Sequence, residues 1–123
     1  GKKSLGPAFK YVHSSKEGTS REAEEPGKLV LFAESDDRET LINCANLTVA
    51  PWGDVILCED HPNAFIRGIT PEGKGYNIAR NIFSDSELAG SCFSPSGKYL
   101  FVNIQGDGLT LAITGPWESL KQA

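Results

Sequence analysis

The sequence predicts an all-β protein made of about two four-stranded antiparallel β-propeller blades. Short apolar runs bounded by turn residues recur along its 123 residues, and we expect helix only as one short turn near the C-terminus. Two Pro-x-Gly turns begin 44 residues apart, at Pro51 and Pro95, and similar apolar residues flank both. A repeat of about 40 to 50 residues, with about four strands in each unit, is typical of a propeller blade.

The N-terminal part, residues 1–45, is expected to hold the outer strands of one blade and a loop. Two strand-like runs occur here, Ala8 to Val12 and Leu29 to Phe32. Residues 14–27 between them have no apolar period, which predicts an exposed loop.

A full blade is predicted at residues 46–84, and a partial blade with a C-terminal tail at 85–123. Proline presets φ for a turn, and glycine relieves a position where a Cβ would be strained. A further turn of this kind, Pro71-Glu72-Gly73, divides the full blade. The expected strands are 46–50, 54–59, 64–69 and 76–80, followed by 89–93, 98–104 and 109–113, with a helical turn at 117–121.

The spacing also allows a single β-sandwich whose hairpins share the same turn chemistry. If the units are blades, two of them cannot close a ring, because propellers need roughly four to eight. An open ring would expose strand edges and an apolar blade face. The chain begins at Gly1 and contains no Met. We therefore expect either missing N-terminal blades or a homo-oligomer that closes the ring, for example three copies giving six blades.

Composition excludes several classes of protein. Hydrophobic residues make up 39% and charged residues 23%, which is too apolar for a disordered chain. The longest apolar runs fall short of the roughly 18 residues of a membrane span, so we expect no membrane partner. A net charge of -4 argues against a nucleic-acid partner. Neither a signal peptide nor another compartment signal is recognisable. The three cysteines fit ordinary buried positions, and at least one is unpaired.

Three oxygen-bearing residues are candidate metal ligands: Asn46, Glu59 and Glu87. Around the turn at Pro51, Asn46 should lie opposite Glu59, give or take one position, at the open end of the hairpin. Glu87 precedes the matching strand of the repeat, where Gly90 and Asn103 form the equivalent pair. Such oxygens suit Ca²⁺, which takes six to eight oxygen ligands. These residues also fit strand ends that simply enter solvent, and that interpretation is favoured for Asp60 and His61. No catalytic residue is assigned.

Several longer motifs are familiar in combination. The stretch from Asn46 to Asp54 leading to Cys58-Glu59-Asp60 resembles the PhoX family of alkaline phosphatases. The same holds for residues 85–97, 100–105 and 112–117, and the resemblance runs from about Gly18 to Trp117. It implies a β-propeller exported by the twin-arginine route, hence periplasmic or secreted, that hydrolyses phosphate esters. It also implies a calcium and iron cofactor at the mouth of the central channel.

The resemblance places Asn46, Glu59 and Glu87 at motif positions that face the metals. Two departures occur. The family motif commonly reads Pro-Asp where this chain has Cys44-Ala45, and Gly commonly stands where this chain has His61. No cysteine of this chain is assigned to iron, which we expect only in a full-length relative.

The sequence therefore leads to two main functional hypotheses. In one, the chain is the C-terminal propeller portion of a PhoX-like phosphatase. It then contributes calcium ligands, is inactive alone, and would act on small phosphate esters if active. In the other, it is a stand-alone, non-catalytic binding or assembly module that closes a propeller by homo-oligomerisation. A third reading is an unrelated β-sandwich without metal.

Overall fold

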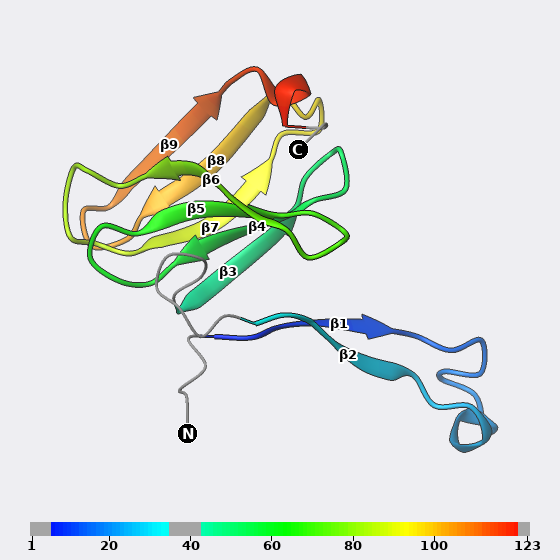
Figure 1. The fold of residues 1–123 in the computed structure, drawn as a ribbon. Coiled ribbons are helices and arrows are strands. Elements are labelled where there is room, and N and C mark those ends of the chain that lie inside the picture. Colours follow the sequence, from blue (N-terminus) through cyan, green and yellow to red (C-terminus); the bar gives the residue numbers. More distant parts are fainter. Residues whose placement is uncertain (1–5, 35–42, 121–123) are drawn as a thin grey trace.

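The computed structural model describes residues 6–34 and 43–120. Within these ranges nine strands form three antiparallel sheets of two, four and three strands (Figure 1). The only helical elements described are two short 3₁₀ turns, η1 (Glu22–Glu24) and η2 (Trp117–Ser119). The prediction of an all-β chain is confirmed. Neither described 3₁₀ turn has the length or the apolar character to cross a membrane.

The two-stranded sheet is an arm that projects from the other two sheets (Figure 1). We call residues 8–33 the arm; it contains β1 (Ala8–Val12), β2 (Lys28–Ala33) and the loop between them. Both strands and the exposed loop match the sequence prediction. The loop carries η1 and is tied by Glu24, which accepts hydrogen bonds from Lys16 Nζ at 2.9 Å and Arg21 Nη2 at 2.7 Å.

The four-stranded sheet is a simple meander in the order β3-β4-β5-β6. Its turns follow the Pro-x-Gly chemistry of the sequence: Gly53 has φ +101° and donates its N–H to Ala50 O at 2.9 Å. Gly73 has φ +86° and makes the same bond to Thr70 O at 2.8 Å. The strands are β3 (Cys44–Val49), β4 (Val55–Glu59), β5 (Phe65–Ile69) and β6 (Gly75–Arg80).

The three-stranded sheet repeats the pattern with one strand fewer. It has the order β7-β8-β9, with β7 (Leu88–Phe93), β8 (Tyr99–Ile104) and β9 (Leu109–Thr114). Each strand lies within two residues of its predicted place. The η2 turn confirms the predicted helical turn from Trp117 to Ser119, Leu120 follows it as the C-cap, and Lys121 lies outside the described residues. The two repeated turns touch, since a Cβ on Gly97 would lie 2.8 Å from Pro51 Cγ.

The register of β7 against β8 differs from the predicted one. Asn103 pairs with Ala89, and the predicted pair of Gly90 with Asn103 is wrong by one residue. The cause is a β-bulge, because the register shifts between Ala89 and Cys92 and Gly90 takes φ +63°. Such bulges insert one extra residue into a strand and bend it.

The main core lies between the four-stranded and three-stranded sheets. Ile56, Leu100 and Val102 are all fully buried there. Trp52, Phe93 and Trp117 pack against this core, with ring centroids 5.5 to 6.0 Å apart. The cluster joins the turn after β3, the end of β7 and η2. Apolar packing and aromatic contact therefore hold these two sheets together.

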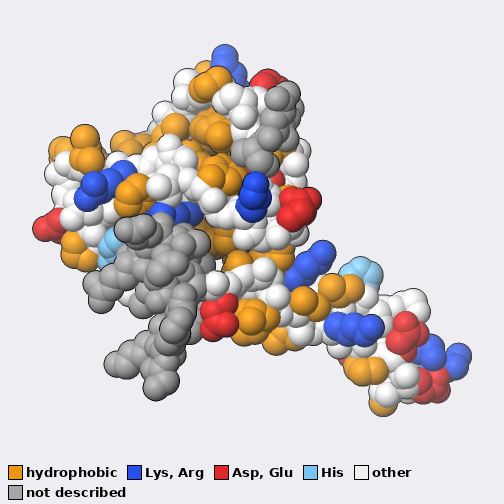
Figure 2. Space-filling model, in the orientation of Figure 1, with side chains coloured by type: hydrophobic (Ala, Val, Ile, Leu, Met, Phe, Trp, Pro, Cys, Tyr) orange, Lys and Arg blue, Asp and Glu red, His pale blue; other side chains and the backbone are white. Residues whose placement is uncertain are grey.

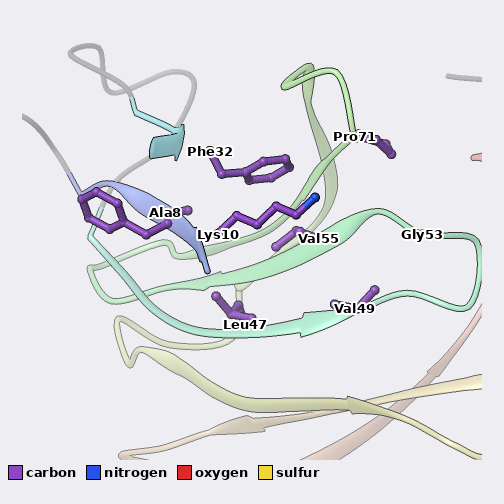
Figure 3. A pocket seen from close by; sticks show the side chains of 9 residues that line it. Ala8, Lys10, Phe32, Leu47, Val49, Gly53, Val55 and Pro71 are labelled. Carbon is purple, nitrogen blue, oxygen red and sulfur yellow. The ribbon is translucent and has the colours of Figure 1, made fainter. Parts of the chain in front are cut away.

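A second, smaller cluster anchors the base of the arm. Phe32 and Ala33 of β2 pack against Leu57 and Ile69, on the face of the four-stranded sheet opposite the main core. Farther along that face the contact opens into an apolar groove of about 330 Å³ between the arm and β3 (Figure 3). Two side chains of β3 that line this groove, Leu47 and Val49, are 52% and 61% exposed.

The three cysteines do not share one environment. All are free thiols: Cys58 is buried, Cys44 half-buried and Cys92 exposed on β7. The expectation of ordinary buried cysteines therefore fails for Cys92. Strand alternation places its side chain on the open face of the three-stranded sheet, away from the main core.

Candidate metal site

The three predicted ligands lie at one end of two neighbouring sheets. Asn46 is near the start of β3, Glu59 ends β4, and Glu87 directly precedes β7. The hairpin register is within one residue of the expected one: Asn46 pairs with Cys58, and Cys44 pairs with Glu59 across a register shift. Contacts of β3 and β4 with β7 bring this end of both sheets together.

Glu59 is a fully buried carboxylate held by protein donors. Its Oε1 accepts a hydrogen bond from Arg67 Nε at 2.7 Å. Its Oε2 accepts one from Phe65 N at 2.9 Å and lies 2.9 Å from His61 Nε2. Arg67, 4% exposed, also donates Nη1 to Asn77 Oδ1 at 2.5 Å. Burial alone would raise the pKa of Glu59, but the hydrogen bonds from Arg67, Phe65 and His61 together lower it.

This arrangement makes Glu59 an internal anchor. A buried charge is tolerated when it is paired and hydrogen-bonded, and both oxygens of Glu59 meet that condition. To bind a metal, Glu59 would have to exchange a protein donor for the cation. One of those contacts comes from His61, the residue that stands where the resembled motif commonly has Gly.

Asn46 fastens the two sheets to each other. Its Oδ1 accepts hydrogen bonds from Ser91 N at 2.7 Å and from Ser91 Oγ at 2.8 Å. Ser91 is 6% exposed and lies on β7. A carbonyl oxygen has two lone pairs, and both are used here. Asn46 therefore explains why the start of β3 sits beside β7, and it has no spare acceptor on that oxygen.

Glu87 presents a different environment, because the charged group that perturbs it is another carboxylate, that of Asp60. A hydrogen bond with Asp60, together with partial burial and the negative charge of Asp60, raises the pKa of Glu87. The backbone fixes both positions: Asp60 N donates to Asn43 O at 2.9 Å, and Gln105 N donates to Glu87 O at 3.1 Å. Two carboxylates held together in this way repel each other once both are ionised, and a cation between them relieves that repulsion.

Asp60 is the residue that sequence reasoning set aside. Its position directly after β4 looked like an ordinary strand end, and the carboxylate partner is 27 positions away in sequence. The usable signal was the Glu59-Asp60 pair at a strand end facing the start of the next unit. The structure thus brings Asp60 and Glu87 together and engages Asn46 and Glu59 elsewhere.

The donor set fits a hard cation in part. Carboxylate oxygens are the ligands that Ca²⁺ prefers, and it takes six to eight of them. Asp60 and Glu87 supply two carboxylates, but across residues 6–34 and 43–120 no three or more His, Cys, Asp or Glu side chains gather as a metal site. The remaining oxygens would have to come from solvent, substrate or protein outside these residues.

Comparison with known proteins identifies the family. Residues 4–108 match the family described as alkaline phosphatase PhoX, which is most of the chain. No curated protein and no solved structure was found to match. The match includes β3, β4 and β7 and hence all of the candidate residues above. The chain belongs to the PhoX family of alkaline phosphatases.

Proposed function

We propose that this chain supplies part of the calcium site of a PhoX-like phosphatase that hydrolyses phosphate monoesters. The observation that carries the proposal is the Asp60–Glu87 carboxylate pair within a chain of this metal-dependent family. When bound, the metal would neutralise charge on the phosphoryl oxygens of the substrate. Iron is assigned only to a full-length relative.

The four candidate residues have two roles in this proposal. Glu87 and Asp60 offer oxygens to Ca²⁺ at the ends of β4 and β7. Asn46 and Glu59 hold the strands behind them, through Ser91 and Arg67 respectively. Either would join the metal only by giving up a protein partner. In this proposal the four-stranded and three-stranded sheets are successive propeller blades, and this end of them would open on the central channel.

The proposal includes inactivity of the chain alone. Two carboxylates fill a minor part of a coordination shell of six to eight oxygens. We therefore expect no turnover of phosphomonoesters when Ca²⁺ and iron are added to the purified chain. Clear turnover that is lost in Glu59→Ala would contradict this part of the proposal.

Calcium-dependent stability tests the site itself. A ligand that binds only the folded state raises its stability by RT ln(1 + [L]/Kd), about 2.7 kcal/mol at 100 times Kd. Saturating Ca²⁺ should raise the unfolding midpoint of the chain, and Glu87→Gln should abolish that rise. Glu72→Gln is the matched control, since Glu72 is exposed on the β5–β6 turn. No rise with Ca²⁺, or an equal rise in Glu87→Gln, would overturn the site.

A non-catalytic assembly module is the second candidate. It is favoured by the exposed apolar side chains of Leu47 and Val49 on the face of the four-stranded sheet away from the main core. In this function, copies of the chain close a propeller by association. A solution mass that stays monomeric at all concentrations would exclude it.

A further inference from the structure

The arm exposes a large apolar surface to solvent. Phe9 pairs with Leu31 and Tyr11 with Leu29, which places these four side chains on one face. They are 53%, 50%, 55% and 68% exposed, whereas Val12 and Val30 lie on the other face of the ribbon. Figure 2 shows this apolar stretch between the sheets and the charged tip of the arm. With roughly 150 to 250 Å² for each large side chain, on the order of 500 Å² is left uncovered.

An isolated two-stranded ribbon is at best marginally stable. The base of the arm is anchored through Phe32 and Ala33, and Phe9 lines the groove beside β3, but Leu29 and Leu31 belong to neither described core cluster. A covering surface is therefore expected.

A second uncovered apolar surface lies on the other side of the molecule. It is a groove of about 210 Å³ between β6 and β9, at the outer edge of the main core. Ile82 and Phe83 stand at its lip, 87% and 68% exposed. The residues that line it are almost all apolar, among them Ile66, Ala79, Leu88, Val102, Leu111 and Ile113.

The strand edge beside this groove is open. β9 is last in the order of its sheet, so its outer backbone groups pair with no strand among residues 6–34 and 43–120. Unpaired strand edges are templates for pairing with another chain. The groove therefore offers both apolar contact and backbone hydrogen bonds to an extended segment.

The arm cannot reach the groove of its own copy while its base stays in place. Phe32 and Ala33 hold the arm to the Leu57 face of the four-stranded sheet. Ile66, which lines the groove, belongs to the main core on the opposite face of that sheet. The arm of a second copy is not restrained in this way and can lie in the groove.

We propose that two copies of this chain exchange arms, each arm lying in the β6–β9 groove of the partner copy and pairing with its β9 edge. One such contact would bury on the order of 1,000 Å² over both surfaces, below the roughly 1,200 to 2,000 Å² of a stable interface. Two reciprocal contacts reach that range, which favours a symmetric dimer. The association needs neither metal nor phosphatase activity, so it stands independently of the proposed calcium site.

Solution mass, measured by sedimentation over a range of concentrations, tests the dimer. A charge placed in a surface that the dimer buries should weaken association about tenfold to a hundredfold. We expect this for Leu29→Asp on the arm and for Phe83→Asp at the groove. Val49→Asp is the matched control, because Val49 is similarly exposed but lines the groove between the arm and β3, not the β6–β9 groove. It should leave the dimer unchanged. A cooperative unfolding transition in each variant shows that the fold is kept, since all three residues are exposed.

Cross-linking tests the contact directly. Leu31→Cys and Ile82→Cys, each in a Cys92→Ser background, should form a disulfide-linked dimer when mixed, well above the amount that either forms alone. A monomer at all concentrations would overturn the exchange. So would a trimer, or a dimer that depends on Val49 and not on Phe83. Failure of the mixed pair to cross-link would also overturn it.

Discussion

At the scale of single residues, the candidate site is divided between two hydrogen-bonded anchors, Glu59 and Asn46, and one pair of carboxylates, Asp60 and Glu87. Glu59 is paired with Arg67 inside the four-stranded sheet, and Asn46 is bonded to Ser91 between the sheets. Buried charges and amides that have partners fix positions; they have little capacity left for a ligand. Asp60 and Glu87 instead interact with each other, and this raises the pKa of Glu87. The chemistry of the site is therefore concentrated in these two side chains.

Removing the guanidinium of Arg67 should destabilise the fold, because the buried carboxylate of Glu59 loses its charged partner. Arg67→Leu leaves the fully buried carboxylate of Glu59 without its guanidinium partner. Breaking a buried pair in this way costs about 3 to 5 kcal/mol of unfolding free energy. The double variant Glu59→Leu/Arg67→Leu should recover most of that loss, since no unpaired charge remains. Urea unfolding measures both, and an Arg67→Leu loss no larger than that of an exposed arginine would contradict the role of the pair.

Glu59 should also make stability depend on acid pH. Its folded pKa lies below its ordinary value of 4.5. The ionised carboxylate then stabilises the fold above pH 4.5, and this contribution is lost as pH falls through the folded pKa. Glu59→Gln should lack that part of the acid loss. The unfolding free energy of the two proteins, compared from neutral pH downward, should converge in acid; a constant difference would contradict the lowered pKa.

At the scale of elements, the strands were predictable and their register was not. Pro51, Pro71 and Pro95 each begin a Pro-x-Gly turn whose glycine takes a positive φ, so turn chemistry alone marks the ends of six strands. The bulge at Gly90 depends on how β7 packs against β8, and no local pattern signals it. Spacing around a turn therefore locates opposite residues to within one position.

The side chain of Tyr76 on β6 packs closely against the backbone of Gly68 on β5. A Cβ on Gly68 of β5 would lie 2.1 Å from Tyr76 Cζ on β6. Gly68→Ala must displace Tyr76, whose hydroxyl donates to the buried Asp54 Oδ2 at 2.5 Å. We expect a loss of about 1 to 3 kcal/mol of unfolding free energy.

The control for this prediction is Gly115→Ala. A Cβ there meets nothing closer than 3.7 Å, so its effect should stay within about 0.5 kcal/mol. Chemical unfolding of both variants provides the comparison. Equal effects at the two glycines would show that Tyr76 moves aside without cost.

At the scale of the whole molecule, the contacts that make the site were beyond the reach of the sequence pattern. The hydrogen bond between Asn46 and Ser91 joins residues 45 positions apart, and Asp60 meets Glu87 across the boundary between two sheets. Residue types at strand ends pointed to the correct end of the molecule. They could not reveal which carboxylates meet each other and which are neutralised internally, because this depends on how the sheets pack.

The way the three sheets pack explains why the patch on the arm and the β6–β9 groove are uncovered. One core joins the two larger sheets, and the arm shares with them only a small cluster at its base. The apolar patch of the arm and the groove beside β9 therefore remain open on opposite sides. Association of copies and metal binding use different surfaces of the chain, so each can be tested without the other.

A crystal structure of the chain grown with Ca²⁺ would show directly whether Asp60 and Glu87 bind the cation. We predict one cation bound by a carboxylate oxygen from Asp60 and one from Glu87, each at about 2.3 to 2.6 Å. Glu59 would remain bonded to Arg67 and Asn46 to Ser91. A calcium-free Asp60–Glu87 pair at saturating Ca²⁺, or a cation bound elsewhere in the chain, would contradict it.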